Sequence, residues 1–346
     1  MDSLSFYSIL SRWYALHARD LPWRHTLDPY RIWLSEIILQ QTRISQGMAY
    51  WQRFVERWPT VTDLAEASED EVLKAWQGLG YYSRARNLHT AAKQVVALGH
   101  FPDTLREIRQ LKGVGDYTAA AVASFAFGIK AASVDGNFYR VLSRIYGIDT
   151  PIDTTSGKKT FAALADSLIQ VVPDTAPSPF GDTMSGASLF NQAMMDFGAT
   201  QCTPQSPRCE DCPFVEECVA YRGNSIASLP VKKGKTAVAT RRFVYVYIRC
   251  QGYTAIRRRG AGDIWQGLWE PPVFEGKPLP PWKGRLTLLA SGVKHVLTHR
   301  ILLADFYCLE TDKRPALSDD YVWIPEVDLK KYAVSRLVEK LLQTLS

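Results

Sequence analysis

The chain has 346 residues, of which 46% are hydrophobic, and a formal net charge of +6. This length suits two domains, each large enough to bury its own core. No apolar run approaches the roughly 20 residues of a membrane span, and the N-terminal segment lacks the basic leader and cleavage site of a signal peptide. We therefore expect a cytoplasmic protein, and the mild positive charge favours an anionic partner without establishing one.

The sequence of residues 1–222 predicts a succession of helices. The stretch "YRIWLSEIILQQT" distributes apolar residues between Ile32 and Leu39 with helical spacing. The stretch "SEDEVLKAWQGLGYY" begins with Ser68 three residues before Glu71, which is the spacing of a capping box. The first part of the chain is therefore predicted to be a helical domain.

A glycine-containing turn lies in "LKGVGDYTAAAV". We expect a helix over 104–111, a turn over 112–116 and a further helix from Tyr117. Gly113 and Gly115 would let backbone N–H groups point outward at a helix N-terminus, where an anion is favoured. No Gly-Lys-Ser/Thr follows, so this is not a nucleoside triphosphate loop. The turn either grips a nucleic-acid phosphate or only joins two helices.

Two carboxylates are candidate catalytic groups because of the residues around them. Glu36 stands in an apolar helix, either at its solvent edge or in an apolar pocket, where burial would raise its pKa and make it a proton donor near neutral pH. Asp135 precedes Gly136 and Asn137 at the start of a predicted helix, where a plain N-cap is the alternative. Together the two carboxylates suit the cleavage of a glycosidic bond.

Four of the six cysteines form the pattern C-x6-C-x2-C-x5-C. They are Cys202, Cys209, Cys212 and Cys218. Four clustered thiolates hold either a tetrahedral zinc or an iron–sulfur cluster, and the spacing by itself slightly favours zinc. Four unrelated buried thiols are the remaining alternative. With all ligand positions filled, such a centre would serve as a scaffold.

The amino-acid composition of the chain changes after the cysteines. Residues 223–240 are small, polar and basic, which is typical of a linker. Beyond them "RFVYVYIRC" and "ADFYCLE" predict strands, and "AVSRLVEKLLQTL" predicts a closing amphipathic helix. The second part is therefore predicted to be a mixed α/β domain.

As a set, these motifs resemble a known family. "LPWR", "YRIWLSEIILQQT", "GLGYYSRARNL", "LKGVGDYTAAAV", "VDGN", "FNQAMMDFGA" and the cysteine pattern follow one another in this order. They resemble the helix-hairpin-helix DNA glycosylases of the endonuclease III superfamily, specifically the MutY-type adenine DNA glycosylases, closely over 6–222 and more weakly to 346. The resemblance implies a mainly α-helical glycosylase domain with an iron–sulfur loop (1–222), a linker (223–240) and a smaller α/β Nudix-like domain (241–346).

The resemblance also assigns roles to residues. It implies one [4Fe–4S] cluster per chain on the four cysteines in place of zinc, and it makes 111–117 a DNA-gripping hairpin. Glu36 becomes the acid that protonates adenine at N7, Asp135 faces the sugar, and Asn137 and Tyr117 support this chemistry. The adenine pocket is implied to contain Arg19, Trp23, Arg24, Leu39 and Gln192.

Tyr117 bears on whether the DNA strand is cut. Relatives that cut the strand carry a lysine here, whose amine forms a Schiff base with the sugar. A phenol cannot form that imine, so we expect a monofunctional glycosylase that leaves the abasic strand intact.

Adenine is stacked in duplex DNA and must be flipped out before an acid can reach it. The resemblance implies that Gln41, Thr42, Leu79 and Tyr81 fill the gap and read the opposite base, with Tyr81 as an aromatic wedge. From the residues alone, "GLGYY" indicates a helix-capping glycine followed by core aromatics.

The second domain resembles the Nudix-like domain that MutY-type proteins use to recognise 8-oxoguanine. "GDIWQGLWEPP" (262–272) matches its most recognisable strand and turn. "KHVLTHRIL" (294–302) stands where the family usually has Phe-Ser-His, so that Thr298 keeps a hydroxyl and His299 is retained, while Leu297 replaces the aromatic residue. Residues 241–346 lack the glutamate-rich metal box of a hydrolytic Nudix enzyme, which indicates sensing and not cleavage.

The sequence therefore predicts a monomeric, DNA-associated protein of bacterial type that removes adenine opposite 8-oxoguanine or guanine in double-stranded DNA. Two alternatives stay open at this stage. One is a thymine glycosylase or a strand-cutting enzyme on the same scaffold, and the other is a catalytically silent protein that binds DNA structures.

Overall fold

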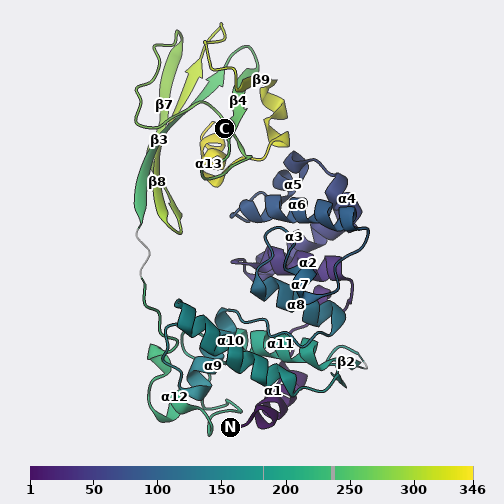
Figure 1. Cartoon of the computed structure of the whole chain (residues 1–346). Helices are drawn as coiled ribbons and strands as arrows, with labels where there is room; N and C mark the ends of the chain where they lie inside the picture. The colour runs from purple at the N-terminus through teal and green to yellow at the C-terminus, as the bar shows by residue number, and fades with distance from the viewer. Residues whose placement is uncertain (182, 235–237, 346) are drawn as a thin grey trace. The chain divides into compact units, whose positions relative to one another are not determined.

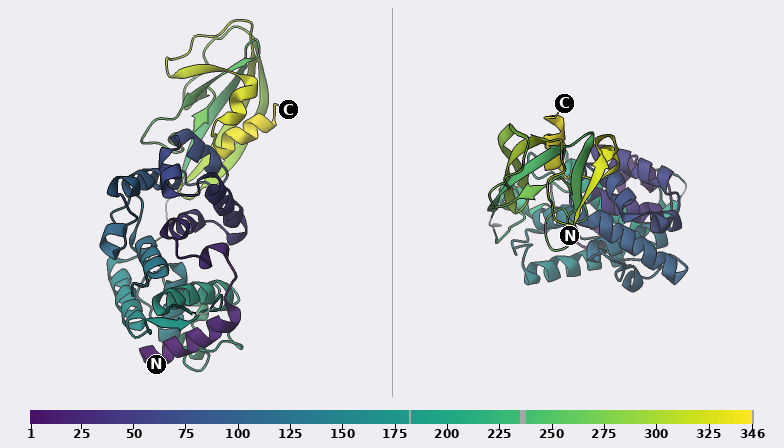
Figure 2. Two further views of the ribbon diagram at one scale, coloured as in Figure 1. Left: turned by 90° about the vertical axis from the view of Figure 1, so that its right-hand side faces the viewer. Right: turned by 90° about the horizontal axis from the view of Figure 1, so that it is seen from above.

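The computed structural model of the chain describes residues 1–181, 183–234 and 238–345. These residues divide into two compact units (Figures 1 and 2). The first comprises 1–62 and 90–234, and the second comprises 63–89 with the described residues after 234. Packing thus groups 63–89 with the C-terminal residues, whereas the sequence pattern placed them in a helical domain over 1–222.

Helices dominate the first unit, as predicted, although one short antiparallel ribbon interrupts them. The helices are α1 (Ser3–His17), η1 (Pro22–Arg24), α2 (Pro29–Leu39), α3 (Ile44–Arg57), α7 (Leu105–Ile108), α8 (Asp116–Phe127), α9 (Gly136–Tyr146), α10 (Thr155–Gln170), α11 (Gly186–Asp196), the π-turn η2 (Phe197–Gln201), α12 (Val219–Arg222) and η3 (Ile226–Ser228). The ribbon pairs β1 (Thr175–Pro177) with β2 (Thr183–Ser185), and α4 (Val61–Glu66) and α6 (Ser83–Leu98) each contribute residues to both units.

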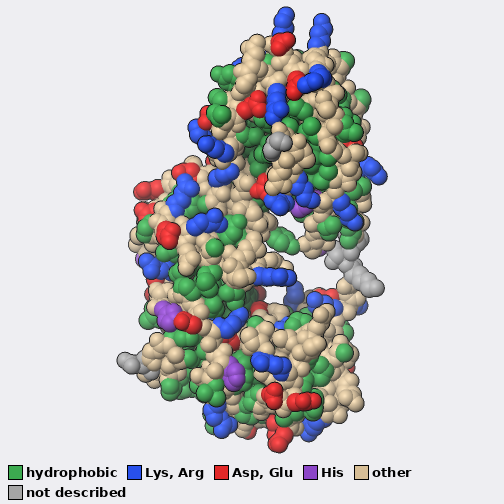
Figure 3. Space-filling model, turned by 180° about the vertical axis from the view of Figure 1, so that it is seen from behind, with side chains coloured by type: hydrophobic (Ala, Val, Ile, Leu, Met, Phe, Trp, Pro, Cys, Tyr) green, Lys and Arg blue, Asp and Glu red, His purple; other side chains and the backbone are tan. Residues whose placement is uncertain are grey.

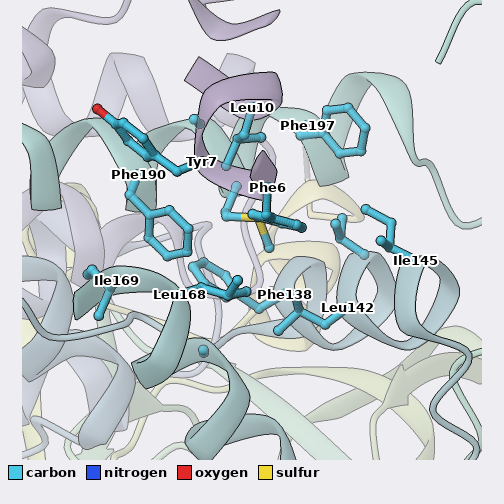
Figure 4. Close-up of a cluster of buried hydrophobic side chains, with 14 of the residues drawn as sticks. Phe6, Tyr7, Leu10, Phe138, Leu142, Ile145, Leu168, Ile169, Phe190 and Phe197 are labelled. Atoms are coloured by element: carbon cyan, nitrogen blue, oxygen red, sulfur yellow. The ribbon is translucent and has the colours of Figure 1, made fainter. Parts of the chain in front are cut away.

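An aromatic core anchors the helices of the first unit (Figure 4). Phe6 on α1 packs against Phe214, with ring centroids 5.0 Å apart, and lies near Phe190 of α11. Phe138 and Leu142 project from α9 into the same core and are fully buried. Because Phe138 lies in the first turn of α9, this core fixes the position of the residues that precede the helix.

The glycine turn differs from its predicted form in two details. The first helix, α7, spans only four residues instead of 104–111, and turns follow it. Gly113 has a φ of +78°, a left-handed conformation that ends regular structure and suits glycine. The second helix, α8, begins at Asp116, one residue earlier than predicted, and Gly115 is its N-cap.

In the second unit, helix α5 (Glu69–Trp76) begins with the predicted capping box between Ser68 and Glu71. The predicted strands and closing helix are also present. The strands are β3 (Ala239–Arg249), β4 (Tyr253–Arg258), β5 (Trp269–Glu270), β6 (Val273–Phe274), β7 (Arg285–Leu297), β8 (Arg300–Glu310) and β9 (Tyr321–Pro325), followed by η4 (Glu326–Lys331) and α13 (Arg336–Gln343).

The strands of the second unit form two sheets, ordered β6-β3-β8-β7 and β5-β4-β9. Strands β3 and β8 are parallel, and β7 and β8 form a long hairpin whose turn is Thr298 and His299. One face of the larger sheet packs on α13 through Phe306, Leu337 and neighbouring residues. On the surface of this unit, basic and acidic side chains are interspersed (Figure 3). The fold class predicted from the sequence is thus confirmed.

Part of the segment predicted to be a linker, 223–240, packs on the first unit. Leu229 is buried, and its carbonyl accepts a hydrogen bond from Arg144 Nε at 3.2 Å. Asp153 accepts from the backbone N–H groups of Lys233 and Gly234 at 2.9 and 3.0 Å. The segment up to 234 therefore packs on the first unit, and residues 235–237 of the predicted linker lie outside the described residues. Within the described ranges, no helix is both long and apolar enough to cross a membrane.

Candidate active site

The first unit contains a pocket of about 330 Å³ between η1, α2, α8, α11 and the start of α9. Ten residues singled out from the sequence line it. They are Arg19, Trp23, Arg24, Glu36, Leu39, Thr42, Tyr117, Asp135, Asn137 and Gln192. Residues about a hundred positions apart in the sequence thus meet at one cavity.

Glu36 lies in the interior and not at the solvent edge of α2. Its neighbours on this helix are buried apolar residues, and only 6% of Glu36 is exposed. Burial raises its pKa to about 7, and the charge of Asp135 acts in the same direction, while a hydrogen bond from Tyr117 and the charge of Arg24 oppose the shift. At neutral pH a large fraction of the Glu36 carboxyl groups is therefore protonated.

Tyr117 reaches Glu36 because α8 packs closely against α2. The first turns of α8 are rich in buried alanines, from Ala119 to Ala123, whose small side chains allow the two helices to approach. The Tyr117 hydroxyl donates to Glu36 Oε2 at 2.6 Å. Burial and the nearby carboxylates raise the pKa of Tyr117 well above its usual value, so the phenol stays neutral and remains a donor.

Asp135 is an N-cap and a pocket residue at the same time. Its Oδ1 accepts from the backbone N–H groups of Asn137 and Phe138 at 2.8 and 2.9 Å, and its Oδ2 accepts from Asn137 Nδ2 at 2.7 Å. Burial raises the pKa of Asp135, and these three hydrogen bonds oppose the rise because they stabilise the ionised form. Glu36 and Asp135 thus share a pocket, but Glu36 accepts one hydrogen bond, from Tyr117, whereas Asp135 accepts three.

Arg140 was not singled out from the sequence, although it lies three residues after Asn137 on the same helix face. It donates to Asn137 Oδ1 and to the Gly198 carbonyl from Nη2, and to the Cys202 carbonyl from Nε, each at 2.7 Å. Asn137 is therefore oriented from both ends, by Arg140 on its oxygen and by Asp135 on its nitrogen.

Arg19 and Arg24 both bind Asp196, a second residue that the sequence analysis missed. Arg24 donates from both terminal nitrogens to the two oxygens of Asp196 at 2.7 Å, and Arg19 donates from Nε to Oδ1 at 2.7 Å. The only sequence signal is an aspartate at the end of the apolar stretch "FNQAMMD". Gln192, on the same helix, accepts from the Tyr14 hydroxyl at 2.8 Å.

Three further predicted residues were assigned to the pocket or to the gap beside the flipped base, and each has its own surroundings: Trp23, Leu39 and Gln41. Trp23 is buried and meets Trp51 edge to face, with centroids 5.6 Å apart. Leu39 fills the space that a side chain at Gly47 would need, since a Cβ there would lie 2.6 Å from Leu39 Cδ2. Gln41 is exposed with a φ of +56° and is not part of the pocket lining.

Four predicted recognition residues belong to the second unit. Tyr81 is 52% exposed, has a φ of +46°, and its hydroxyl lies 2.5 Å from Thr298 Oγ1. Thr298 and His299 are exposed at the turn of the β7–β8 hairpin, whereas Leu79 is buried. Within "GLGYY" the capping-glycine interpretation holds for the backbone, but only Tyr82, and not Tyr81, is a core aromatic.

The four clustered cysteines are free thiols. Cys218 is buried, its thiol donates to the Arg144 carbonyl at 3.4 Å, and Arg144 Nη1 lies 3.5 Å from Cys202 Sγ. Burial, together with the other three cysteines, raises the pKa of Cys212 to about 12, although a backbone hydrogen bond from Phe214 opposes the rise. No group of three or more His, Cys, Asp or Glu side chains in the described part of the chain is placed to hold a metal ion.

Comparisons with known proteins agree with this fold. A family model described as HhH-GPD superfamily base excision DNA repair protein matches residues 34–166, and a NUDIX domain model matches residues 244–344. An adenine DNA glycosylase of Buchnera aphidicola subsp. Baizongia pistaciae is 32% identical over 278 residues, covering 79% of this chain and 75% of the relative.

Two further comparisons involve shorter stretches. The human adenine DNA glycosylase is 41% identical over 227 residues, which cover 62% of this chain and 39% of the longer human protein. The solved structure of a thermostable thymine-DNA glycosylase is 33% identical with a TM-score of 0.56 and covers 64% of this chain and 97% of its own.

The helical unit and its carboxylate pocket define a helix-hairpin-helix enzyme of base-excision DNA repair. Within this class, the chain belongs to the adenine DNA glycosylase family. Its reaction is the cleavage of the N-glycosidic bond that joins a base to the DNA sugar.

The hydrogen bond from Tyr117 to Glu36 leads to a prediction. Replacing Tyr117 by Phe removes a donor that stabilises the ionised carboxylate, so the pKa of Glu36 should rise above the value of about 7 in the parent protein. The change is measurable by NMR titration of a ¹³C-labelled glutamate carboxyl. Tyr221→Phe, at an exposed tyrosine of the same unit, should leave that pKa unchanged. An unchanged or lower pKa in Tyr117→Phe would contradict this description of the site.

Proposed function

We propose that this glycosylase removes adenine that is mispaired with 8-oxoguanine or guanine in duplex DNA and leaves the DNA strand intact. The observation that carries the proposal is the meeting of Glu36 and Asp135 in one pocket, where burial raises the pKa of Glu36 to about 7 and three hydrogen bonds to Asp135 favour its ionised form. The pairing of a proton donor with a carboxylate is what the hydrolysis of a glycosidic bond needs.

In the proposed first step, protonated Glu36 donates its proton to N7 of a flipped adenine. The base then leaves as a neutral molecule, and the electron pair of the glycosidic bond goes with it. The raised pKa of Glu36 supports this role because a carboxylic acid must still hold its proton near neutral pH to donate it.

In the proposed second step, Asp135 faces the positively charged sugar that remains. Ionised Asp135 stabilises the oxocarbenium-like sugar electrostatically until water attacks it and gives up a proton to Glu36, which the first step left ionised. Asn137 supports the step by holding Oδ2 of Asp135 in place, and Arg140 in turn fixes the Asn137 amide. The product is an abasic site on an unbroken strand.

Two observations support a monofunctional reaction. The residue next to Glu36 is Tyr117, whose neutral phenol cannot form a Schiff base with the sugar. Among the described residues that line the pocket, none is a lysine. Lys112 is exposed at the glycine turn, where its charge suits a DNA phosphate.

Duplex DNA is the proposed partner of both units. In the first unit, the turn with Gly113 and Gly115 exposes backbone at the start of α8, which suits a phosphate. In the second unit, exposed Tyr81 is proposed as the wedge beside the flipped base, and Thr298 and His299 as the groups that meet the opposite 8-oxoguanine. Gln41, Thr42 and Leu79 are proposed to complete the contacts around the gap.

The cysteine loop is proposed to hold one [4Fe–4S] cluster. Four thiols from one loop supply the donor set of such a cluster, and the fully buried guanidinium of Arg144 beside Cys202 would offset the negative charge of a thiolate-ligated centre. When bound, the cluster serves as a structural crosslink, and no step of base removal passes through it.

The first test is a set of duplexes that contain A:8-oxoG, A:G, T:G or an oxidised pyrimidine. We expect base removal from A:8-oxoG and A:G, with strand breaks only after alkali. Activity should fall as pH rises through about 7, because Glu36 then loses the proton that it donates. Asp135→Asn and Glu36→Gln should abolish base removal, while binding to an uncleavable duplex persists.

Other outcomes would favour the alternatives. A strand break without alkali would refute the monofunctional mechanism, and removal of thymine from T:G would favour a thymine glycosylase. Full activity of Glu36→Gln would remove the acid from the mechanism. Loss of both activity and DNA binding in Asp135→Asn would assign that residue a folding role.

A second prediction concerns the opposite base. Thr298→Ala removes the hydroxyl at the hairpin turn, so the rate preference for A:8-oxoG over A:G should fall several-fold, by the order of one hydrogen bond. Thr311→Ala, in the loop that directly follows β8 of the same unit, is the matched control and should leave the preference unchanged. An unchanged preference in Thr298→Ala would exclude this turn from recognition.

A third prediction concerns the cysteines. Protein purified without air should contain about four iron atoms and four inorganic sulfides per chain, and Cys212→Ser should lose them. Cys250→Ser, at a buried cysteine outside the loop, should retain them. One zinc per chain in place of iron would favour the alternative that the spacing of the cysteines first suggested.

A further inference from the structure

We propose that Asp196 is a positioning residue that holds Arg19 and Arg24 beside the pocket and cancels their charge, so that Glu36 keeps the proton it donates. This inference rests on the proposed role of Glu36 as the acid. It adds a third carboxylate to the site, one that touches neither base nor sugar and acts through the two arginines.

Both carboxylate oxygens of Asp196 accept several hydrogen bonds from the two arginines. Its Oδ1 accepts from Arg19 Nε and Arg24 Nη2, both at 2.7 Å, and lies 2.5 Å from Arg19 Nη2. Its Oδ2 accepts from Arg24 Nη1 at 2.7 Å and from the Arg19 backbone N–H at 2.9 Å. Such a bidentate pairing fixes the plane of a guanidinium as well as its position.

Burial makes this pairing obligatory. Asp196 is completely buried, and the side chain of Arg24 is only 6% exposed, whereas that of Arg19 is 29% exposed. A guanidinium does not lose its proton in a protein, so Arg24 remains charged whether or not a carboxylate faces it. Removing one partner of a buried ion pair leaves the other charge uncompensated. Without Asp196, the pocket wall would therefore carry an uncompensated positive charge at Arg24.

That charge acts on Glu36. Among the charged and titratable groups that face Glu36, Arg24 stabilises its ionised form, Tyr117 on α8 does the same by hydrogen bonding, and Asp135 before α9 opposes both. Arg43 at the start of α3 also lines the pocket. Because Asp196 partly cancels the positive field of Arg24 at Glu36, it favours the protonated form of Glu36 without contacting it.

Through Arg24, Asp196 also supports a second part of the pocket lining, at Gln192. The Arg24 guanidinium lies over the Tyr14 ring, 5.9 Å from its centroid, and the Tyr14 hydroxyl donates to Gln192 Oε1 at 2.8 Å. Arg24 further donates from Nη1 to the Arg19 carbonyl at 2.8 Å. Displacing Arg24 would thus disturb both the loop before η1 and a side chain on α11 that lines the pocket.

The test is the titration of the Glu36 carboxyl by ¹³C NMR in Asp196→Asn, with the pH profile of base removal as a second readout. We expect the pKa of Glu36 to fall by about one unit from its value of about 7. The basic limb of the activity profile should move with it, which corresponds to about eightfold lower activity at about pH 7.5. Asp196→Glu keeps a negative charge at this position, so the pKa of Glu36 should return most of the way to its parent value.

Asp20→Asn is the matched control. Asp20 adjoins Arg19 in the sequence, but its side chain is 80% exposed, so its loss should leave the Glu36 titration unchanged. An unchanged pKa in Asp196→Asn would overturn the inference and leave the proposed function intact. Full activity of Glu36→Gln would instead overturn the proposed function, independently of any titration.

A paired variant keeps the test available if Asp196→Asn does not fold. In Arg24→Gln combined with Asp196→Asn, both charges disappear together, so the pKa of Glu36 should stay close to that of the parent protein. In Arg24→Gln alone it should rise, since Asp196 then faces only Arg19. If the paired variant shows the same raised pKa as Arg24→Gln alone, Asp196 contributes nothing and the inference is wrong.

Discussion

The burial of one carboxyl group, Glu36, is the constraint on which the rest of the site depends. An ionised carboxylate in an apolar helix is costly, and the pocket reduces the cost only in part, through one phenol hydrogen bond and one arginine held at a distance. The group therefore retains its proton near neutral pH. The same burial that opposes ionisation makes Glu36 useful as an acid, and its neighbours adjust how strongly it holds the proton.

The fold delivers this arrangement through close packing. The alanines of α8 let that helix approach α2 until Tyr117 reaches Glu36, and the aromatic core beneath α9 fixes Asp135 at the helix N-terminus. Three donors point at the two oxygens of Asp135 and favour its ionised form, against the effect of burial. In the proposed mechanism, two carboxyl groups of similar intrinsic acidity thus take different roles because their surroundings differ.

Much of this site could be predicted from the sequence, because its motifs are local. Asp135 directly precedes a helix, the glycine turn is continuous in sequence, and Glu36 stands out in an apolar run. Asp196 and Arg140 could not be found in this way. Asp196 binds two arginines from the start of the chain, and Arg140 binds the distant carbonyls of Gly198 and Cys202 as well as nearby Asn137. These distant contacts leave no local signal in the sequence, and the grouping of 63–89 with the C-terminal residues likewise depends on tertiary packing. The apolar pattern through Leu111 did not indicate that α7 ends at Ile108 and that turns follow it.

Neutron diffraction from crystals equilibrated at about pH 6 would show which of the two carboxyl groups holds a proton, because it locates the exchangeable hydrogen atoms. We expect a deuteron on the Glu36 carboxyl, none on Asp135, and the Tyr117 deuteron directed at Glu36 Oε2. An ionised Glu36 beside a protonated Asp135 would contradict this expectation.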